Sequence, residues 1–192
     1  KNKREDNTMS ATEVLLDPAI EAIIEEKVRT ILSRRSQEKR KRLAIVASKG
    51  TLDMAYPPLI LATTAAAMGW EVGIFCTFYG LDILNRKKIR KFKVAPLGNP
   101  AIPIPVPNII GALPGMTAVA TQMMKSWMSK AKIPPLHELL DIAKESNVRL
   151  FACTTTLGVM GVKKEDIIEG AEFAGAATFL DFASEANVTL FV

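Results

Sequence analysis

The stretch of this sequence best suited to chemistry is residues 147–163, NVRLFACTTTLGVMGVK, which contains Cys153. An apolar, β-prone run precedes the cysteine, which predicts that the thiol ends a strand. Beyond the carboxyl end of a parallel strand, backbone amides and helix N-termini favour an anion and stabilise a thiolate. Cys153 is therefore a candidate nucleophile, and the alternative is a small buried apolar residue, the usual role of free cysteine. The polar or flexible residues that follow it are Thr154, Thr155, Thr156, Gly158 and Gly161.

A second cysteine occupies a matching position. Cys76 lies near the end of a predicted strand at residues 71–77 (EVGIFCT), before Phe78 and Tyr79. Strands of a parallel sheet end at one edge, so the two thiols are candidates for a disulfide, which needs Cα atoms within about 7 Å. Side-chain alternation decides whether both face one pocket, and the sequence leaves that open. With two cysteines, one histidine and no CxxC spacing, we predict no metal site.

The first predicted strand, residues 43–48 (LAIVAS), is followed by a third candidate segment. Gly50 and Thr51 lie in the turn after it, and residues 56–68 are predicted to be a helix with two prolines in its first turn. The segment KGTLD has too few glycines for a phosphate-binding loop or a dinucleotide fingerprint. The candidates for an anion pocket are Thr154, Thr155, Thr156, Gly158, Gly50, Thr51 and Tyr79.

The elements that must position these residues alternate between strand and helix, which predicts an α/β fold with a central, mostly parallel sheet and helices on both faces. We expect the α/β domain to span residues 43–192. The predicted strands are residues 43–48, 71–77, 148–153 and 188–192. The predicted helices are residues 56–68, 115–129, 136–146, 163–174 and 176–185, with His137 exposed rather than catalytic.

Residues 1–42 form a predicted N-terminal extension with an amphipathic helix at residues 17–33. The basic segment 34–42 (RRSQEKRKR) is either a contact for an acidic partner or phosphate, or a solvated helix end. The extension holds 11 of the 25 Lys and Arg and 8 of the 20 Asp and Glu, which leaves 14 basic and 12 acidic residues in residues 43–192. The domain is nearly neutral, so the charge balance by itself does not indicate nucleic-acid binding.

An uncharged run at residues 94–124 invites comparison with a membrane span. Prolines interrupt it, whereas a spanning helix needs about 20 apolar residues with intact backbone hydrogen bonds. We therefore predict no transmembrane segment and a long loop at residues 94–114, of a length typical of lids, binding loops or assembly surfaces. The first ten residues, KNKREDNTMS, lack the apolar core of a secretory signal, so we expect reduced thiols and a cytoplasmic location.

The segment from residue 151 to 192, together with IFCTFYGLDIL and NIIGALPGMTAVATQMM, resembles the DsrE/DsrF/DrsH-like family of sulfur-relay proteins over residues 43–192. The most specific feature is the cysteine after a strand, followed by Met160 and Gly161. The resemblance implies a flavodoxin-like three-layer fold, a homo-oligomer, and a persulfide or S-thiosulfonate on the residue matching the motif, Cys153. It also implies small sulfur-carrier proteins and a sulfane-sulfur or thiosulfate donor as partners. Cys76 is not expected in every member.

Three functions remain open at this point. The first is a cysteine-based sulfur carrier or sulfurtransferase, in which backbone amides stabilise the anionic adduct without a metal or organic cofactor. The second is a non-catalytic assembly module that uses the helix at residues 12–40 and the proline-rich loop. The third is a peripheral membrane or nucleic-acid binder through residues 34–42 and 86–93, which salt-dependent retention on polyanions would favour. We predict the first, with no nucleic acid as a partner.

Overall fold

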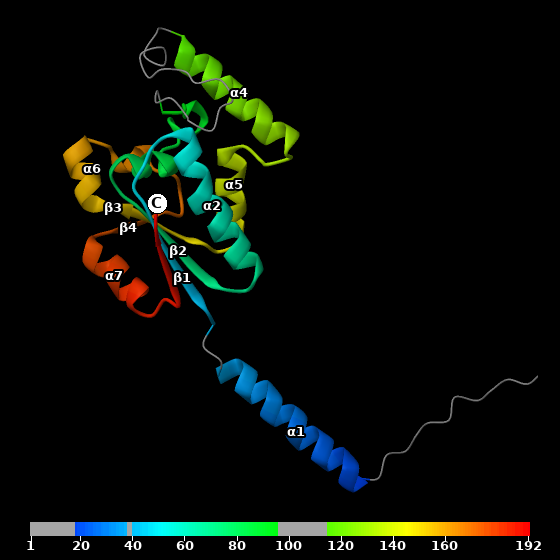
Figure 1. Cartoon of the computed structure of the whole chain (residues 1–192). Coiled ribbons are helices and arrows are strands. Elements are labelled where there is room, and N and C mark those ends of the chain that lie inside the picture. Colours follow the sequence, from blue (N-terminus) through cyan, green and yellow to red (C-terminus); the bar gives the residue numbers. More distant parts are fainter. Residues whose placement is uncertain (1–17, 38–39, 96–114) are drawn as a thin grey trace, which may run out of the picture. The chain divides into compact units, whose positions relative to one another are not determined.

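In a computed structural model, the chain divides into two compact units, Lys1–Lys39 and Arg40–Val192 (Figure 1). The described residues are 18–37, 40–95 and 115–192. The greater part of the predicted loop at residues 94–114 therefore lies outside the described residues.

The first unit contributes one described helix, α1 (Pro18–Gln37), which confirms the helix predicted at residues 17–33. It continues beyond that range into the basic segment 34–42, as far as Gln37. Aliphatic side chains recur along it from Ile20 to Ile31, and each is between 46% and 59% exposed.

The second unit is a three-layer α/β domain built on a five-stranded sheet. All four strand pairs are parallel, which confirms the predicted flavodoxin-like class. The strand order is β4-β3-β2-β1-β5, so successive strands run outward from β1 before β5 returns to its other side. The strands are β1 (Arg42–Ala47), β2 (Glu71–Cys76), β3 (Arg149–Cys153), β4 (Glu172–Ala174) and β5 (Val188–Phe191).

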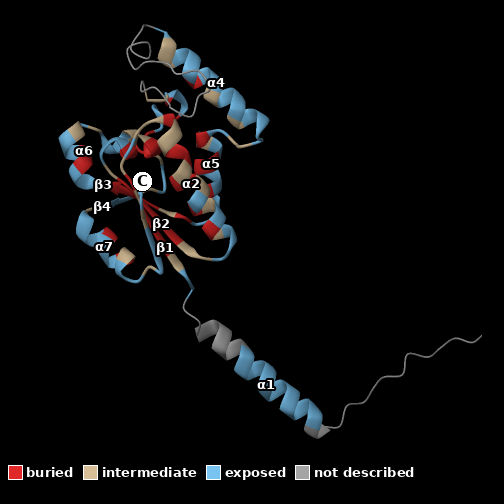
Figure 2. Cartoon of the chain, in the orientation of Figure 1, coloured by how far each residue is buried: buried red, intermediate tan, exposed pale blue. Residues whose placement is uncertain are grey.

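Helices pack on both faces of the sheet (Figure 1), with α2 and α5 on one face and α7 on the other. Figure 2 shows the buried residues concentrated on the strands and on the sides of the helices that meet them. The predictions for residues 115–129, 136–146 and 176–185 are confirmed by α4, α5 and α7. The helices of the domain are α2 (Leu52–Ala67), α4 (Met116–Lys130), α5 (Leu136–Glu145), α6 (Thr154–Met160) and α7 (Ala176–Ser184). The 3-10 segments are η1 (Phe78–Leu84), η2 (Ile89–Lys91) and η3 (Lys164–Asp166).

The helix predicted at residues 163–174 is wrong. That stretch contains η3 and then the edge strand β4, with Gly170 between them at a φ of 88°. Ile167 is 2% exposed, and the amide of Ile168 donates to the carbonyl of Leu84 at 2.9 Å. Tertiary hydrogen bonds and burial therefore replace the helical bonds that the apolar spacing suggested.

The start of α2 also differs from the prediction. The helix begins at Leu52, because the amide of Ala55 already donates to the carbonyl of Thr51 at 2.9 Å. Pro57 and Pro58 consequently lie in the second turn rather than the first. Proline has no amide hydrogen, so neither residue can donate a helical bond to the preceding turn.

In the described part of the chain, no helix combines the length and the apolar character needed to cross a bilayer.

Candidate functional site

Cys153 lies where a buried strand becomes a helix. It is the last residue of β3 and the N-cap of α6, which confirms that the thiol ends a strand. Behind it, on the α7 face of the sheet, stands a cluster of aromatic rings in which Phe75 and Phe179 stack with centroids 4.8 Å apart. This packing holds the end of β3 in place, so the position of the thiol is set by the core.

The Cys153 pocket, as we call the cavity that this residue lines, has a volume of about 240 Å³. Cys153 itself is only 6% exposed, so the pocket is its route to reactants. Among the described residues no charged side chain lines the pocket, so its polar groups are hydroxyls and backbone amides. The lining residues are Phe75, Thr77, Phe78, Cys153, Thr155, Thr156, Val159, Met160 and Ala176.

Two threonine hydroxyls form a short network beside the thiol. The oxygens of Thr77 and Thr156 lie 3.1 Å apart, and the amide of Phe78 donates to Thr156 Oγ1 at 3.0 Å. Each hydroxyl has one hydrogen to donate. Both hydroxyls are also hydrogen-bond donors to Cys153, so each can give its hydrogen either to the other threonine or to the sulfur. Thr156 is 4% exposed, so water competes little for these bonds.

The hydrogen-bond donors around Cys153 lower the pKa of its thiol. Burial acts to raise the pKa, but it is outweighed by hydrogen bonds from the Thr156 hydroxyl and amide, the Thr77 hydroxyl and the Thr155 amide. These donors favour the charged form, as helix N-termini do for reactive cysteines. The thiolate is the nucleophilic form of cysteine, so the site increases the reactive fraction at neutral pH.

Phe78 adopts an unusual backbone conformation at the rim of the pocket. Its φ is 45°, in the left-handed region that non-glycine residues rarely adopt. The bond from its amide to Thr156 and the close packing of the following Gly80 hold it there. Strained residues of this kind concentrate at functional sites.

The structure brings Thr155 and Thr156 to the Cys153 pocket, but it does not bring the other anion candidates there. Thr154 is exposed, and its hydroxyl points to the carbonyl of Ala174 at 3.5 Å. Gly158 is exposed, and an added Cβ would meet nothing within 4 Å, so the backbone there does not require glycine.

The candidates from the first turn lie elsewhere. Gly50 and Thr51 line a separate pocket of about 410 Å³ beside η2. Tyr79 is 65% exposed, and its backbone oxygen would lie 2.5 Å from a Cβ added to Gly50. Gly50 is therefore needed for the close approach of η1 to this turn, which is a packing role.

The two thiols leave the sheet on opposite faces. Cys76 is fully buried in the core beneath α2 and α5, whereas Cys153 packs in the aromatic cluster beneath α7. Burial raises the pKa of the Cys76 thiol to about 12. Side chains alternate along β2, so the preceding residue, Phe75, is the one that points to the α7 face. Cys76 points to the other face, and this arrangement does not favour a disulfide with Cys153.

Sequence reasoning missed Thr77, Phe78 and the two side chains of α6 that complete the pocket, Val159 and Met160. Thr77 carried the same signal as Thr154, because each directly follows a strand and adjacent parallel strands end at one edge. Phe78 carried no such signal, since its conformation depends on contacts distant in the sequence.

Within the described ranges, no group of three or more His, Cys, Asp or Glu side chains gathers as a metal site requires. His137 is half-buried and lines a different pocket from that of Cys153.

The basic tract 86–93 is partly engaged within the domain. Lys87 pairs with Asp166 at 2.5 Å and Lys88 pairs with Asp82 at 2.7 Å, while Arg86 donates to the carbonyl of Ile167 at 2.7 Å. These bonds give half of the tract's six basic residues a structural partner. The side chains of residues 34–39 lie outside the description.

We expect Thr156→Val to raise the pKa of Cys153 and to slow its alkylation at pH 7 by about three- to tenfold, because a smaller fraction of the thiol is ionised. The pH midpoint of alkylation should lie below that of an ordinary cysteine in the wild type and move upward in the variant. The measurement is the rate of iodoacetamide labelling against pH. Thr156→Ser keeps the hydroxyl and Thr154→Val leaves the network intact, so both should retain the wild-type profile. An unchanged pH profile in Thr156→Val would show that the hydroxyl network does not lower the pKa of Cys153.

Comparisons with known proteins find sequence relatives over most of this chain. The sequence profile of the DsrE/DsrF/DrsH-like family matches residues 39–191. The chain is 44% identical over 159 residues to "Sulfur carrier protein DsrE2" of Allochromatium vinosum, covering 80% of this chain and 99% of that protein. It is 32% identical over 165 residues to "Uncharacterized protein YrkE" of Bacillus subtilis, covering 81% and 99%. The crystal structure of the YchN protein from E. coli aligns with a TM-score of 0.48 at 11% identity, covering 80% of this chain and 100% of that one.

Proposed function

Because this chain belongs to the DsrE/DsrF/DrsH-like family, we propose that it is a sulfur carrier whose Cys153 thiolate accepts sulfane sulfur and passes it to a thiol of a partner protein. The observation that carries the proposal is the placement of Cys153 in an uncharged pocket, with four hydrogen-bond donors that favour its thiolate. The relative named a sulfur carrier supports the same role.

Loading from tetrathionate illustrates the chemistry. The Cys153 thiolate attacks one of the two central sulfur atoms, a bond forms between that atom and Sγ, and the central S–S bond breaks. Thiosulfate leaves with the electron pair of the broken bond, and the protein carries an S-thiosulfonate. One S–S bond replaces another, so the step needs no external oxidant or reductant.

Transfer to a partner is the same exchange in the opposite direction. The partner's thiolate attacks the sulfur bonded to Sγ, the new S–S bond forms on the partner, and Cys153 leaves as a thiolate. A thiol of low pKa is a better leaving group, so the donors that assist loading also assist release.

The mouth of the Cys153 pocket suits a protein partner. Phe78 and Val159 line it and are 61% and 74% exposed, and the neighbouring Tyr79 is 65% exposed. Exposed apolar side chains that gather in one place are typical of interaction sites. The pocket is smaller than the roughly 300 Å³ at which sites for drug-sized molecules begin, which suits a small sulfur-bearing group.

Two further expectations from the sequence stay predictions. One is a homo-oligomer whose contacts involve the helix predicted at residues 17–33 and the segment 94–129, which light scattering at micromolar concentration decides. A cytoplasmic location is another. The thiol environment supports sulfur transfer and gives no such support to the assembly module or to the polyanion binder. The polyanion-binding alternative is weakened further because residues 86–88 bind partners within the domain.

The test is to incubate the reduced protein with tetrathionate and to measure its intact mass. We expect the mass of one thiosulfonate group per chain, located on the peptide of Cys153, with Cys76 unmodified. A reduced small sulfur-carrier protein added afterwards should gain the group as this chain loses it. Failure to load, or loading on Cys76, would contradict the proposal.

A further inference from the structure

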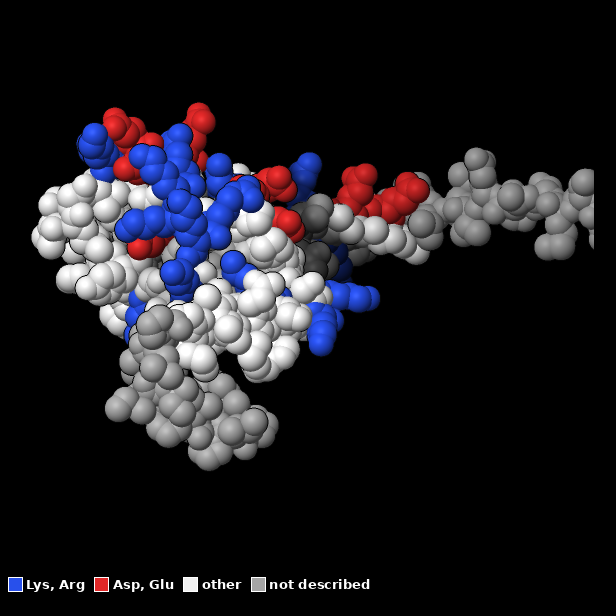
Figure 3. All heavy atoms as spheres, turned by 90° about the horizontal axis from the view of Figure 1, so that it is seen from above, with Lys and Arg blue, Asp and Glu red and all other residues white. Residues whose placement is uncertain are grey.

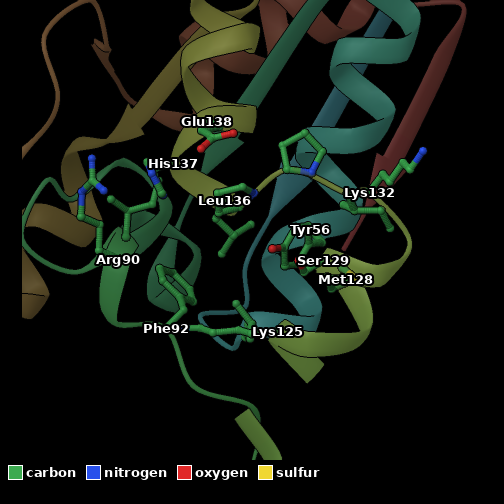
Figure 4. Close-up of a pocket in the computed structure, with 15 residues that line it drawn as sticks. Tyr56, Arg90, Phe92, Lys125, Met128, Ser129, Lys132, Leu136, His137 and Glu138 are labelled. Carbon is green, nitrogen blue, oxygen red and sulfur yellow. The ribbon is translucent and has the colours of Figure 1, made fainter. Parts of the chain in front are cut away.

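A larger cavity lies apart from the Cys153 pocket, between the start of α2, η2, the end of α4 and the start of α5 (Figure 4). We call it the α4–α5 pocket. Its volume is about 640 Å³, within the range of about 300 to 1,000 Å³ that holds small organic ligands. It shares no lining residue with the Cys153 pocket.

The wall of the α4–α5 pocket is largely apolar. Leu52, Ile89 and Leu136 are nearly fully buried there, and Phe92 is 6% exposed. Figure 4 shows Leu136 and Tyr56 near the middle of the view, with Phe92 to one side. An occupant therefore needs an apolar body that these side chains can cover.

One polar group on the wall of this cavity, the Tyr56 hydroxyl, has no hydrogen-bond partner within the described part of the chain and remains accessible to a ligand. Tyr56 is 5% exposed and lines the pocket, and no described residue forms a hydrogen bond with its hydroxyl. A buried tyrosine usually finds such a partner. Burial raises the pKa of Tyr56, so its hydroxyl stays protonated and is available as a donor.

Cations outnumber anions around the opening. Arg90, Lys125 and Lys132 line the pocket against one carboxylate, Glu138, and none of the three cations has an ion pair within the described part of the chain. In Figure 4, Arg90 and Lys132 stand on opposite sides of Tyr56. Figure 3 shows Lys and Arg side chains gathered in a band on the surface seen from above.

The start of α5 adds to this positive potential. Its N-cap is Pro135, which has no side chain able to accept from the first-turn amides, and the first helical residues line the pocket. The positive end of the helix dipole therefore meets the cavity.

We propose that the α4–α5 pocket is a second ligand site, for a small organic anion with an apolar body and a carboxylate or sulfonate head. The apolar wall covers the body, while the cations and the Tyr56 hydroxyl bind the head. The site is independent of sulfur transfer, because Cys153 lies outside it.

Octanoate is the probe, and isothermal titration on the full chain measures its binding. We expect saturable binding, at least about tenfold weaker for 1-octanol, which lacks the charge and with it a charge-assisted hydrogen bond. Acetate, which lacks the apolar body, should not bind measurably. Equal binding of octanol would overturn the anion specificity, and no saturable octanoate binding would overturn the site.

Variants locate the site. Arg90→Gln and Tyr56→Phe should each weaken octanoate binding by about tenfold or more, the loss of one hydrogen bond to a charged group. Lys132→Gly removes a cation at a position where φ is 57°, a conformation that glycine adopts readily. This variant should therefore fold, and weaker octanoate binding by it would report the loss of the cation. Lys130→Gln, an exposed change on α4 outside the lining, and Cys153→Ser should bind as the wild type does. Octanoate binding that is unchanged in Arg90→Gln, Tyr56→Phe and Lys132→Gly would overturn the proposal.

Discussion

Replacing Cys153 with serine is expected to abolish sulfur loading while leaving the fold intact. A serine hydroxyl does not ionise at neutral pH and cannot form the S–S bond on which carriage depends. Serine is close to cysteine in size and can accept the hydrogen bonds that Thr155 and Thr156 offer at this position. The measurement is intact mass after tetrathionate treatment, together with the thermal melting curve of the variant.

Cys76→Ser is the matched control for this prediction. It changes the other thiol, which is fully buried on the opposite face of the sheet, so loading of the folded protein should continue. A serine hydroxyl in that apolar core without a partner costs about 1–3 kcal/mol, so this variant should melt at a lower temperature. Loading that survives in Cys153→Ser but fails in Cys76→Ser would reverse the assignment of the two cysteines.

Gly80→Ala is expected to destabilise the domain by about 3 kcal/mol, the upper part of the usual range for overpacking. A Cβ at this position would lie 2.1 Å from the carbonyl oxygen of Ala47 and 2.6 Å from its carbonyl carbon. Both are backbone atoms of β1, so relief requires that η1 or the strand end move. Because η1 begins at Phe78, the same movement should disturb the rim of the Cys153 pocket.

Gly158→Ala serves as the comparison for that variant. An added Cβ there meets nothing within 4 Å, and the residue lies inside α6, where alanine is favoured over glycine by about 0.5–1 kcal/mol. Urea unfolding should therefore show opposite signs for the two glycines. Equal stability of Gly80→Ala and the wild type would mean that η1 packs on β1 less closely than the structure shows.

The sequence by itself determined where the strands lie and what stands at their ends. Four largely apolar runs predicted β1, β2, β3 and β5 to within one residue at each end. For β1, β2 and β3 the reason is burial on both faces, which leaves no need for polar positions, whereas β5 is an edge strand whose residues are mostly exposed. The position of Cys153 at the end of β3 followed from the same pattern. The family was identified by resemblance, whose most specific features, the cysteine after a strand and the pair Met160 and Gly161, are local features of the chain.

Local patterns failed where distant residues supply the hydrogen bonds. The stretch that contains β4 looked helical by the spacing of its apolar residues, yet it pairs with β3 and bonds to Leu84. Phe78, which has a left-handed backbone conformation, bonds to Thr156, 78 residues away, and Thr77 bonds to the same residue, 79 residues away. No window of neighbouring residues contains that information.

Tertiary structure alone decided which thiol faces a pocket. The sequence placed both cysteines at one edge of the sheet but could not say on which face either lies. Successive side chains alternate between faces, so a difference of one position sends a side chain to the opposite side. Cys76 pairs with Ala152 and Cys153 with Ala174, so Cys76 lies one step short of the position level with Cys153 and points into the other core. Strand register, which is set by packing across the whole sheet, is therefore the physical reason that Cys153 lines a pocket and Cys76 lies in the opposite core.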